Sequence, residues 1–152
     1  MKRNIRYIVV HCTSTPPETT LKPMLEIWRQ GKENPPYHYL IDRNGMVIQS
    51  LFENSIAHND TPNNEECMHI AYLGGINKAG NSADTRSKGQ KDALYDKLVA
   101  LSNKYHNAVI VGKNELCETV SPCFNVKQWI GEYEPDLSEE EFSDDIEFLE
   151  AA

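Results

Sequence analysis

Residues 37–48 carry the clearest local folding signal of the chain, an Asn-Gly pair between two apolar runs. The runs are Tyr37–Ile41 and Met46–Ile48, and the pair between them is Asn44-Gly45. Asn and Gly tolerate the positive φ angles that a tight hairpin turn requires. We therefore predict a β-hairpin over residues 37–48, and with it a β-sheet at the centre of the fold.

Three further β-branched or apolar runs predict buried strands, and they cover residues 6–10, 68–73 and 108–111. A long helix is predicted between the last two, because Ser87 and Gln90 have the spacing of a capping box and leucines follow on one face. Shorter helices are predicted over residues 20–30 and 125–130. A helix between two buried strands suggests a crossover, so the expected class is α/β.

The length and composition fit one globular domain. The chain has 152 residues, of which 39% are hydrophobic and 25% charged. No apolar run approaches the roughly 20 residues that span a bilayer, so no membrane span is expected. The apolar stretch after Lys2 and Arg3 is shorter than a signal-peptide core. We therefore expect a cytoplasmic protein, or release by a route without a signal peptide if it acts outside the cell.

The negative charge is concentrated at the C-terminus. The net charge is −8, but residues 132–152 hold ten acidic and no basic residues, which leaves 15 basic and 13 acidic residues in the body, a net of +2. A body this close to neutral gives no reason to expect nucleic-acid binding.

The acidic tail also has a helical pattern. Ser138 and Glu141 form a second possible capping box, and Phe142, Ile146 and Leu149 repeat at helical spacing. The predicted helix would either pack on its own domain or present an apolar stripe to a partner protein.

Five segments together resemble the zinc-dependent N-acetylmuramoyl-L-alanine amidases, a family that includes phage amidase-type lysozymes and peptidoglycan recognition proteins. They follow the family's order and spacing: Tyr7–Ser14, Tyr37–Gly45, Ile70–Ile76, Ala83–Arg86 and Ser121–Asn125. The resemblance implies a single amidase-like domain over residues 1–131, followed by the acidic tail over 132–152. It implies a mixed, mainly parallel central β-sheet flanked by helices, with a groove for peptidoglycan.

The resemblance also implies a zinc ion held by two His and one Cys, with the fourth position left for the attacking water. His11 matches the first ligand. Lys113 stands at the second ligand position and Ser121 at the third. A protonated lysine has no lone pair to offer, and a serine hydroxyl is a poor zinc ligand compared with a thiolate. We therefore expect no tightly bound cofactor, unless Cys123, Cys117 or His69 completes a rearranged zinc site.

The remaining site residues also follow from the resemblance. Tyr37 matches a tyrosine that orients the water or stabilises the oxyanion, and Thr119 falls at a second polar catalytic position. His58 is expected to be a groove residue or a structural residue, not a ligand. His69 stands where relatives commonly have Gly, and is expected to alter the groove floor or to pack between strand and helix.

Three functions remain open from the sequence. The first is a catalytically impaired amidase-like protein that binds a muropeptide. The second is an active amidase with a non-standard metal site. The third is a protein-interaction or inhibitory module on the amidase scaffold, for which the acidic tail would supply the contact.

Overall fold

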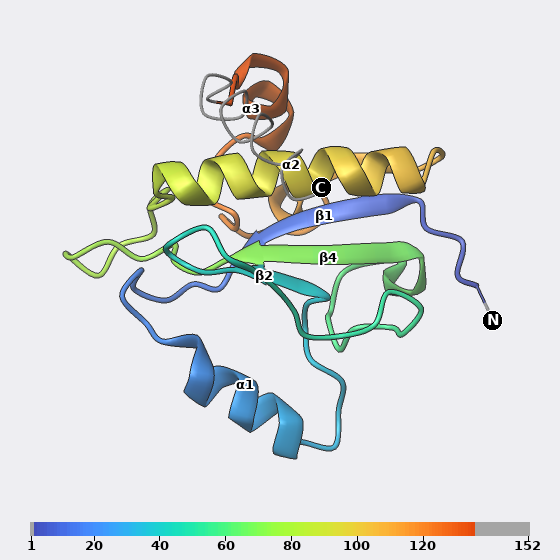
Figure 1. The fold of residues 1–152 in the computed structure, drawn as a ribbon, viewed down its shortest axis with the longest axis horizontal. Coiled ribbons are helices and arrows are strands. Elements are labelled where there is room, and N and C mark those ends of the chain that lie inside the picture. The colour runs from blue at the N-terminus through green and yellow to red at the C-terminus, as the bar shows by residue number, and fades with distance from the viewer. Residues whose placement is uncertain (1, 136–152) are drawn as a thin grey trace, which may run out of the picture.

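The computed structural model describes residues 2–135 and has a five-stranded sheet in the order β3-β2-β4-β1-β5 (Figure 1). The strands are β1 (Tyr7–Cys12), β2 (Tyr39–Ile41), β3 (Val47–Gln49), β4 (Cys67–Tyr72) and β5 (Val109–Gly112). Three neighbouring pairs are parallel, and only β2 with β3 is antiparallel. The predicted α/β class and the mixed, mainly parallel sheet are confirmed.

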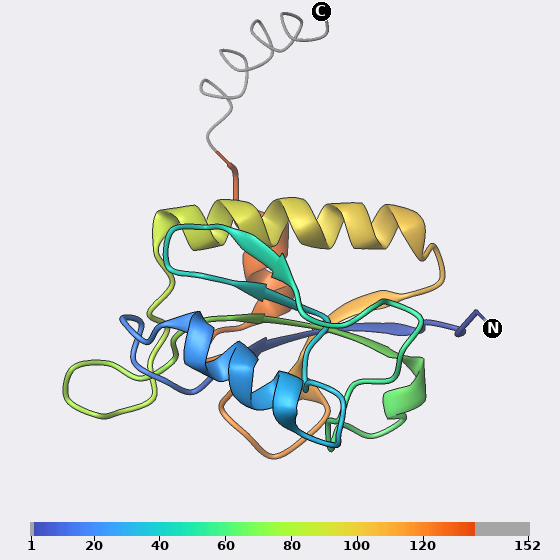
Figure 2. The same cartoon turned by 60° about the horizontal axis from the view of Figure 1, so that its bottom comes forward.

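Helices cover both faces of this sheet. The α-helices are α1 (Leu21–Gln30), α2 (Lys88–Lys104) and α3 (Val126–Glu132), and two short 3-10 helices are η1 (Asn64–Glu66) and η2 (Lys113–Glu115). Helices α2 and α3 lie on one side of the sheet and α1 on the other (Figure 2). The predicted acidic helix lies outside the described residues. Among residues 2–135, no helix is long and apolar enough to cross a membrane.

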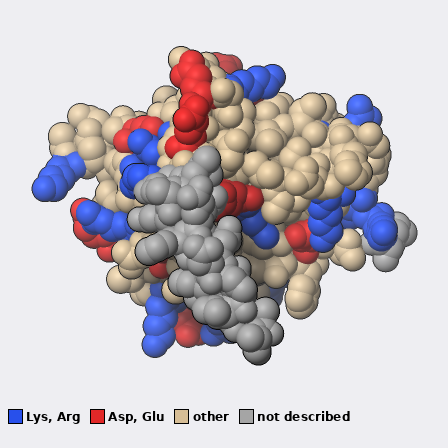
Figure 3. Space-filling model, turned by 45° about the horizontal axis from the view of Figure 1, so that its top comes forward, with Lys and Arg blue, Asp and Glu red and all other residues tan. Residues whose placement is uncertain are grey.

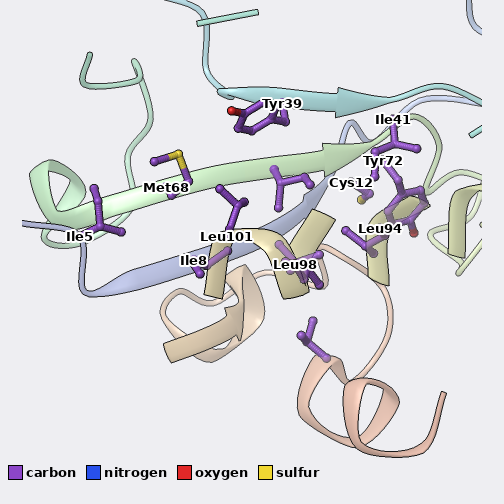
Figure 4. Packing of buried hydrophobic residues seen from close by; sticks show 13 residues of the cluster. Ile5, Ile8, Cys12, Tyr39, Ile41, Met68, Tyr72, Leu94, Leu98 and Leu101 are labelled. Carbon is purple, nitrogen blue, oxygen red and sulfur yellow. The ribbon is translucent and has the colours of Figure 1, made fainter. Parts of the chain in front are cut away.

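The hydrophobic core lies between the sheet and α2. Alternate residues of β1 and β4 point towards the helix, among them Ile8 and Met68, and they pack against Leu94, Leu98 and Leu101 (Figure 4). These three leucines are at most 2% exposed. Burying each one stabilises the fold by about 1.5–3 kcal/mol.

The start of α2 is tied to the sheet by one glutamine. The predicted capping box is present. The backbone N–H of Gln90 donates to Ser87 Oγ at 3.1 Å, and the backbone N–H of Ser87 donates to Gln90 Oε1 at 2.9 Å. The Gln90 side-chain amide also donates to the carbonyls of Ile41 and Leu73. The helix therefore begins at a fixed position over the ends of β2 and β4.

The hairpin has a wider turn than the Asn-Gly pair predicts. Only Gly45 adopts a positive φ, of 89°, and its N–H donates to the Asp42 carbonyl. The Asp42 carboxylate accepts the N–H groups of Asn44 and Met46, both at 2.9 Å. This side chain stabilises the longer loop, so Asn44 keeps a negative φ. Gly45 is also required by packing, because a Cβ there would lie 2.7 Å from the Gly89 carbonyl oxygen on α2.

Helix α1 lies over the face of the sheet opposite α2 (Figure 2). Helix α1 has no buried residue, and it approaches this face through Trp28, whose ring lies 6.1 Å from that of Tyr37. The other alternate residues of the strands point to this side, among them Val9 and His11 of β1 and His69 of β4. These three side chains are nevertheless at most 2% exposed.

Candidate functional site

Three histidines form a buried cluster on the α1 side of the sheet. His11 is the fifth residue of β1, His69 the third residue of β4, and His38 directly precedes β2. Their exposed fractions are 2% for His11 and 0% for the other two. The register places His69 beside Val9, so His11 lies one repeat further along the same face.

Hydrogen bonds join the cluster into a chain. His11 Nε2 lies 2.8 Å from His69 Nδ1, and His69 Nε2 lies 2.6 Å from Asn64 Oδ1. The backbone N–H of His69 donates to His38 Nδ1 at 3.0 Å, and His38 Nε2 lies 2.8 Å from the Ser55 carbonyl. The rings of His38 and His69 are parallel, with centroids 5.9 Å apart.

Burial keeps these imidazoles neutral. It lowers the pKa of His38 to about 4 and that of His69 to about 3, because a charged ring would lose its hydration. The pKa of His11 falls well below its usual value, first by burial and then by the neighbouring His69 and Lys113. The cluster therefore supplies neutral rings at physiological pH.

Lys113 stands directly after β5, as the first residue of η2. Its Nζ donates to Asp60 Oδ1 at 2.6 Å and to Asn59 Oδ1 at 3.3 Å. The lysine side chain is 16% exposed, whereas that of Asp60 is 90% exposed. The hydrogen bond and charge of Lys113 lower the pKa of Asp60. The ammonium is therefore held in place at the edge of the site by an exposed carboxylate.

Ser121 is a buried hydrogen-bond acceptor for β1. Its Oγ accepts the backbone N–H of Cys12 at 3.0 Å, and Cys12 Sγ lies 3.6 Å from the same oxygen. Thr119 Oγ1 in turn accepts the N–H of Ser121 at 3.3 Å. Cys123 Sγ lies 3.9 Å from Cys12 Sγ. The 119–123 loop is thus attached to the end of β1 beside His11.

Some of the predicted site residues line two different pockets. A pocket of about 450 Å³ is lined by Pro36, Tyr37, His58, Asn59, Asp60 and Lys113. Thr119 instead lines a larger depression of about 800 Å³, together with residues of η2 and the start of α3. The structure therefore brings Tyr37, His58 and Lys113 together, but it does not place Thr119 in the same pocket.

The two histidines that were expected in the groove, His58 and His69, lie in different places. His58 is exposed in the pocket, with Nδ1 3.6 Å from Glu33 Oε1. His69 lines no part of the pocket, because it is completely buried on the α1 side of β4. Tyr37 lies between the pocket and the histidine cluster. It lines the pocket, and its ring centroid lies 5.1 Å from that of His11. Burial raises the pKa of Tyr37 to about 12, so its hydroxyl stays protonated.

The donor set at the three expected ligand positions does not fit a zinc ion. Nζ of Lys113 is an ammonium engaged with a carboxylate, and Oγ of Ser121 already accepts a backbone N–H. Among residues 2–135, no three His, Cys, Asp or Glu side chains are grouped so that they could hold a metal ion. Cys123, Cys117 and His69 therefore do not complete a rearranged cage with His11 in this structure.

Sequence reasoning missed three partners of these residues. Asp60 belongs to the irregular segment after β3, and Asn64 is the first residue of η1. His38 directly precedes β2, in the run that predicts the hairpin. Their partners are 5 to 53 positions away in the chain. For His38 one signal was available, and it was chemical: a polar residue in a run that the pattern predicts to be buried requires a partner.

On the side formed by α2 and α3, the described charged residues are of both signs (Figure 3). Lys, Arg, Asp and Glu lie interspersed among uncharged residues over the side formed by α2 and α3 (Figure 3). Among residues 2–135, the part of that side visible in Figure 3 shows no extended basic patch of the kind that binds a nucleic-acid backbone.

Comparison with known proteins identifies relatives with this fold. The Amidase_2 family, described as N-acetylmuramoyl-L-alanine amidase, matches residues 1–122. The endolysin of Escherichia phage T7 is 28% identical over 125 residues, which cover 80% of this chain and 83% of the phage protein. The endolysin of Klebsiella phage KP32 is 29% identical over 126 residues, with the same coverage of both chains.

Solved structures agree with this assignment. The Ph2119 endolysin from Thermus scotoductus MAT2119 bacteriophage Ph2119 has a TM-score of 0.66 at 25% identity, over 87% of this chain and 86% of that one. The Drosophila peptidoglycan recognition protein SA has a TM-score of 0.63 at 23% identity, over 88% and 80% of the two chains, which is a likeness of fold alone. Since the family match covers most of its length, this chain belongs to the N-acetylmuramoyl-L-alanine amidase family.

Proposed function

We propose that this protein binds a peptidoglycan fragment in the pocket beside Tyr37 and Lys113 and does not hydrolyse it. The observation that carries the proposal is the chemistry at the expected ligand positions. His11 is joined there by an ion-paired ammonium, Lys113, and by a hydroxyl, Ser121, whose oxygen is already in use. Such a set does not hold the divalent cation that would activate a water molecule.

The pocket has the polar groups that a muropeptide requires. The Tyr37 hydroxyl stays a donor at neutral pH, and the Lys113 ammonium supplies a charge-assisted donor. The N-acetylmuramoyl group and its stem peptide offer matching acceptors, which are amide carbonyls and carboxylates. A pocket of about 450 Å³ accommodates a short fragment of that kind.

The Asp60 carboxylate does not prevent this. Its side chain is 90% exposed, and an ion pair with so exposed a partner is worth little in water. A carboxylate of the ligand would therefore compete with Asp60 for Lys113 at small cost. The exchange would keep the ammonium paired in both states.

Calorimetric titration of metal-stripped protein with N-acetylmuramoyl-L-alanyl-D-isoglutamine tests the proposal. We expect saturable binding that weakens roughly tenfold or more in Lys113→Met, because a charge-assisted hydrogen bond is lost. Lys127→Met is the matched control. Lys127 pairs with Glu115 and lines the larger depression, so its loss should leave the affinity unchanged.

Two outcomes would count against the proposal. The absence of heat at any accessible concentration would remove the binding function. Release of stem peptide from purified peptidoglycan, abolished by a chelator and restored by zinc, would instead support the metal-dependent hydrolysis that the family resemblance implies.

A further inference from the structure

His69 is a buried polar residue that the proposed pocket does not use. It lies beneath the surface with no exposed area, and both of its ring nitrogens are engaged, Nδ1 with His11 and Nε2 with Asn64. A buried imidazole with two specific partners costs desolvation that ordinary apolar packing would avoid. Its contacts therefore call for a role beyond filling space.

Asn64 decides which ring nitrogen of His69 carries the proton. The Asn64 side-chain nitrogen donates to the Ala57 carbonyl at 2.7 Å, so its Oδ1 faces His69 Nε2. The reverse orientation would bring two oxygens to that short separation, which is repulsive. Since Oδ1 only accepts, His69 Nε2 must be the donor.

The proton positions then follow along the chain. A neutral His69 with Nε2–H has an unprotonated Nδ1, which only accepts. His11 Nε2, at 2.8 Å from it, must therefore donate. The only nitrogen of His11 left with a lone pair is Nδ1, for which residues 2–135 provide no hydrogen-bond partner.

His38 keeps the ring of His69 in this orientation. The His69 backbone N–H donates to His38 Nδ1, which leaves His38 Nε2–H to donate to the Ser55 carbonyl. The two rings stack in parallel planes, with 2° between them. The ring of His69 is thus restrained at both nitrogens and on one face.

We propose that His69, held by Asn64, is a positioning residue that fixes His11 as the Nε2–H tautomer, so that His11 offers a hydrogen-bond acceptor and not a donor to a ligand. The inference deepens the proposed binding function. Tyr37, whose ring contacts that of His11, and Lys113 both present donors. His11 is 2% exposed and does not line the pocket of Tyr37 and Lys113. A peptide group that reaches its Nδ1 would find an acceptor for its N–H there and donors for its carbonyl in Tyr37 and Lys113.

Nitrogen NMR of the full chain measures the tautomer directly. Long-range ¹H–¹⁵N spectra distinguish a ring nitrogen that carries hydrogen from one that carries a lone pair. For His11 we expect hydrogen on Nε2 and a lone pair on Nδ1. Observation of Nδ1–H, or of an even mixture of tautomers, would overturn the inference.

Two substitutions of His69 separate positioning from packing. In His69→Asn the new Oδ1 can replace the Nδ1 acceptor, so the tautomer of His11 should be retained. In His69→Leu the acceptor is lost, and we expect a mixture of tautomers and affinity for the muramyl peptide that is roughly fivefold weaker. If His69→Leu kept both the tautomer and the affinity, His69 would be no more than a packing residue.

A third variant keeps the test sharp if His69→Leu does not fold. Asn64→Ala removes the acceptor for His69 Nε2 from a half-buried position on η1 and frees His69 to change tautomer. We expect His11 to become mixed there as well, and an unchanged Nε2–H population would contradict the relay. The NMR measurement needs no ligand, so it decides the tautomer even if the muramyl peptide does not bind.

Discussion

Acidification should destabilise this protein because it folds around neutral histidines. Burial lowers the pKa of His38 to about 4 and that of His69 to about 3, from an ordinary value of 6.5. Between these values the unfolded chain binds more protons than the folded chain. Lowering the pH therefore favours the unfolded state, and stability is lost as the pH falls below about 6.5.

The size of the effect at pH 5 depends little on the folded pKa values. Each unit of pH below the unfolded pKa costs about 1.36 kcal/mol per histidine that stays neutral in the fold. A fall to pH 5 thus costs about 2 kcal/mol for His38 and about 2 kcal/mol for His69. His11, whose pKa is lowered in the same direction, adds a loss of the same sign.

Urea unfolding at pH 7.5 and pH 5.0, at constant ionic strength, measures this difference. We expect the free energy of unfolding to fall by about 4 kcal/mol or more, a large part of the stability of an ordinary domain. The His69→Asn variant should show a pH-dependent loss that is smaller by about 2 kcal/mol, because asparagine takes up no proton in this range. A wild-type free energy that changes by less than about 1 kcal/mol would refute the reasoning.

Three further predictions follow from particular contacts. The double variant Lys113→His with Ser121→Cys restores two good ligands beside the end of β1, so elemental analysis should find bound zinc in it and none in either single variant. A metal-free double variant would show that the surrounding geometry also departs from a zinc site. Treatment with diamide should join Cys12 to Cys123, whose sulfurs lie 3.9 Å apart, with the loss of two hydrogens by mass spectrometry; two free thiols at those positions after treatment would contradict the contact. Gly45→Ala should destabilise the protein by at least about 1 kcal/mol in urea, since φ is 89° and the new Cβ would press on α2; an unchanged midpoint would exclude that close approach.

Much of the fold could be predicted because its signals are local. The capping box at Ser87 and Gln90 fixes the start of α2, and the caps and apolar runs place the other elements to within a few residues. The turn after β2 was less predictable. Its form depends on the Asp42 carboxylate, which competes with the Asn44-Gly45 preference for a shorter turn.

The site was predictable only in part, because its decisive contacts are not local. The positions of His11, Lys113 and Ser121 follow from the family resemblance. No pattern pairs Lys113 with Asp60, 53 residues away. The contacts of His69 were equally hidden, because β4 is buried on both faces and its residues do not alternate in polarity, so the sequence does not indicate which face each side chain takes.

Zinc content of the purified wild-type chain tests most directly the claim that this amidase-family site has changed from metal-assisted hydrolysis to binding. After expression in zinc-supplemented medium and dialysis without chelator, elemental analysis should find far less than one zinc ion per chain. Near-stoichiometric zinc that is lost when His11 is replaced by alanine would contradict the claim, because it would mean that an imidazole, a lysine and a serine do form a metal site.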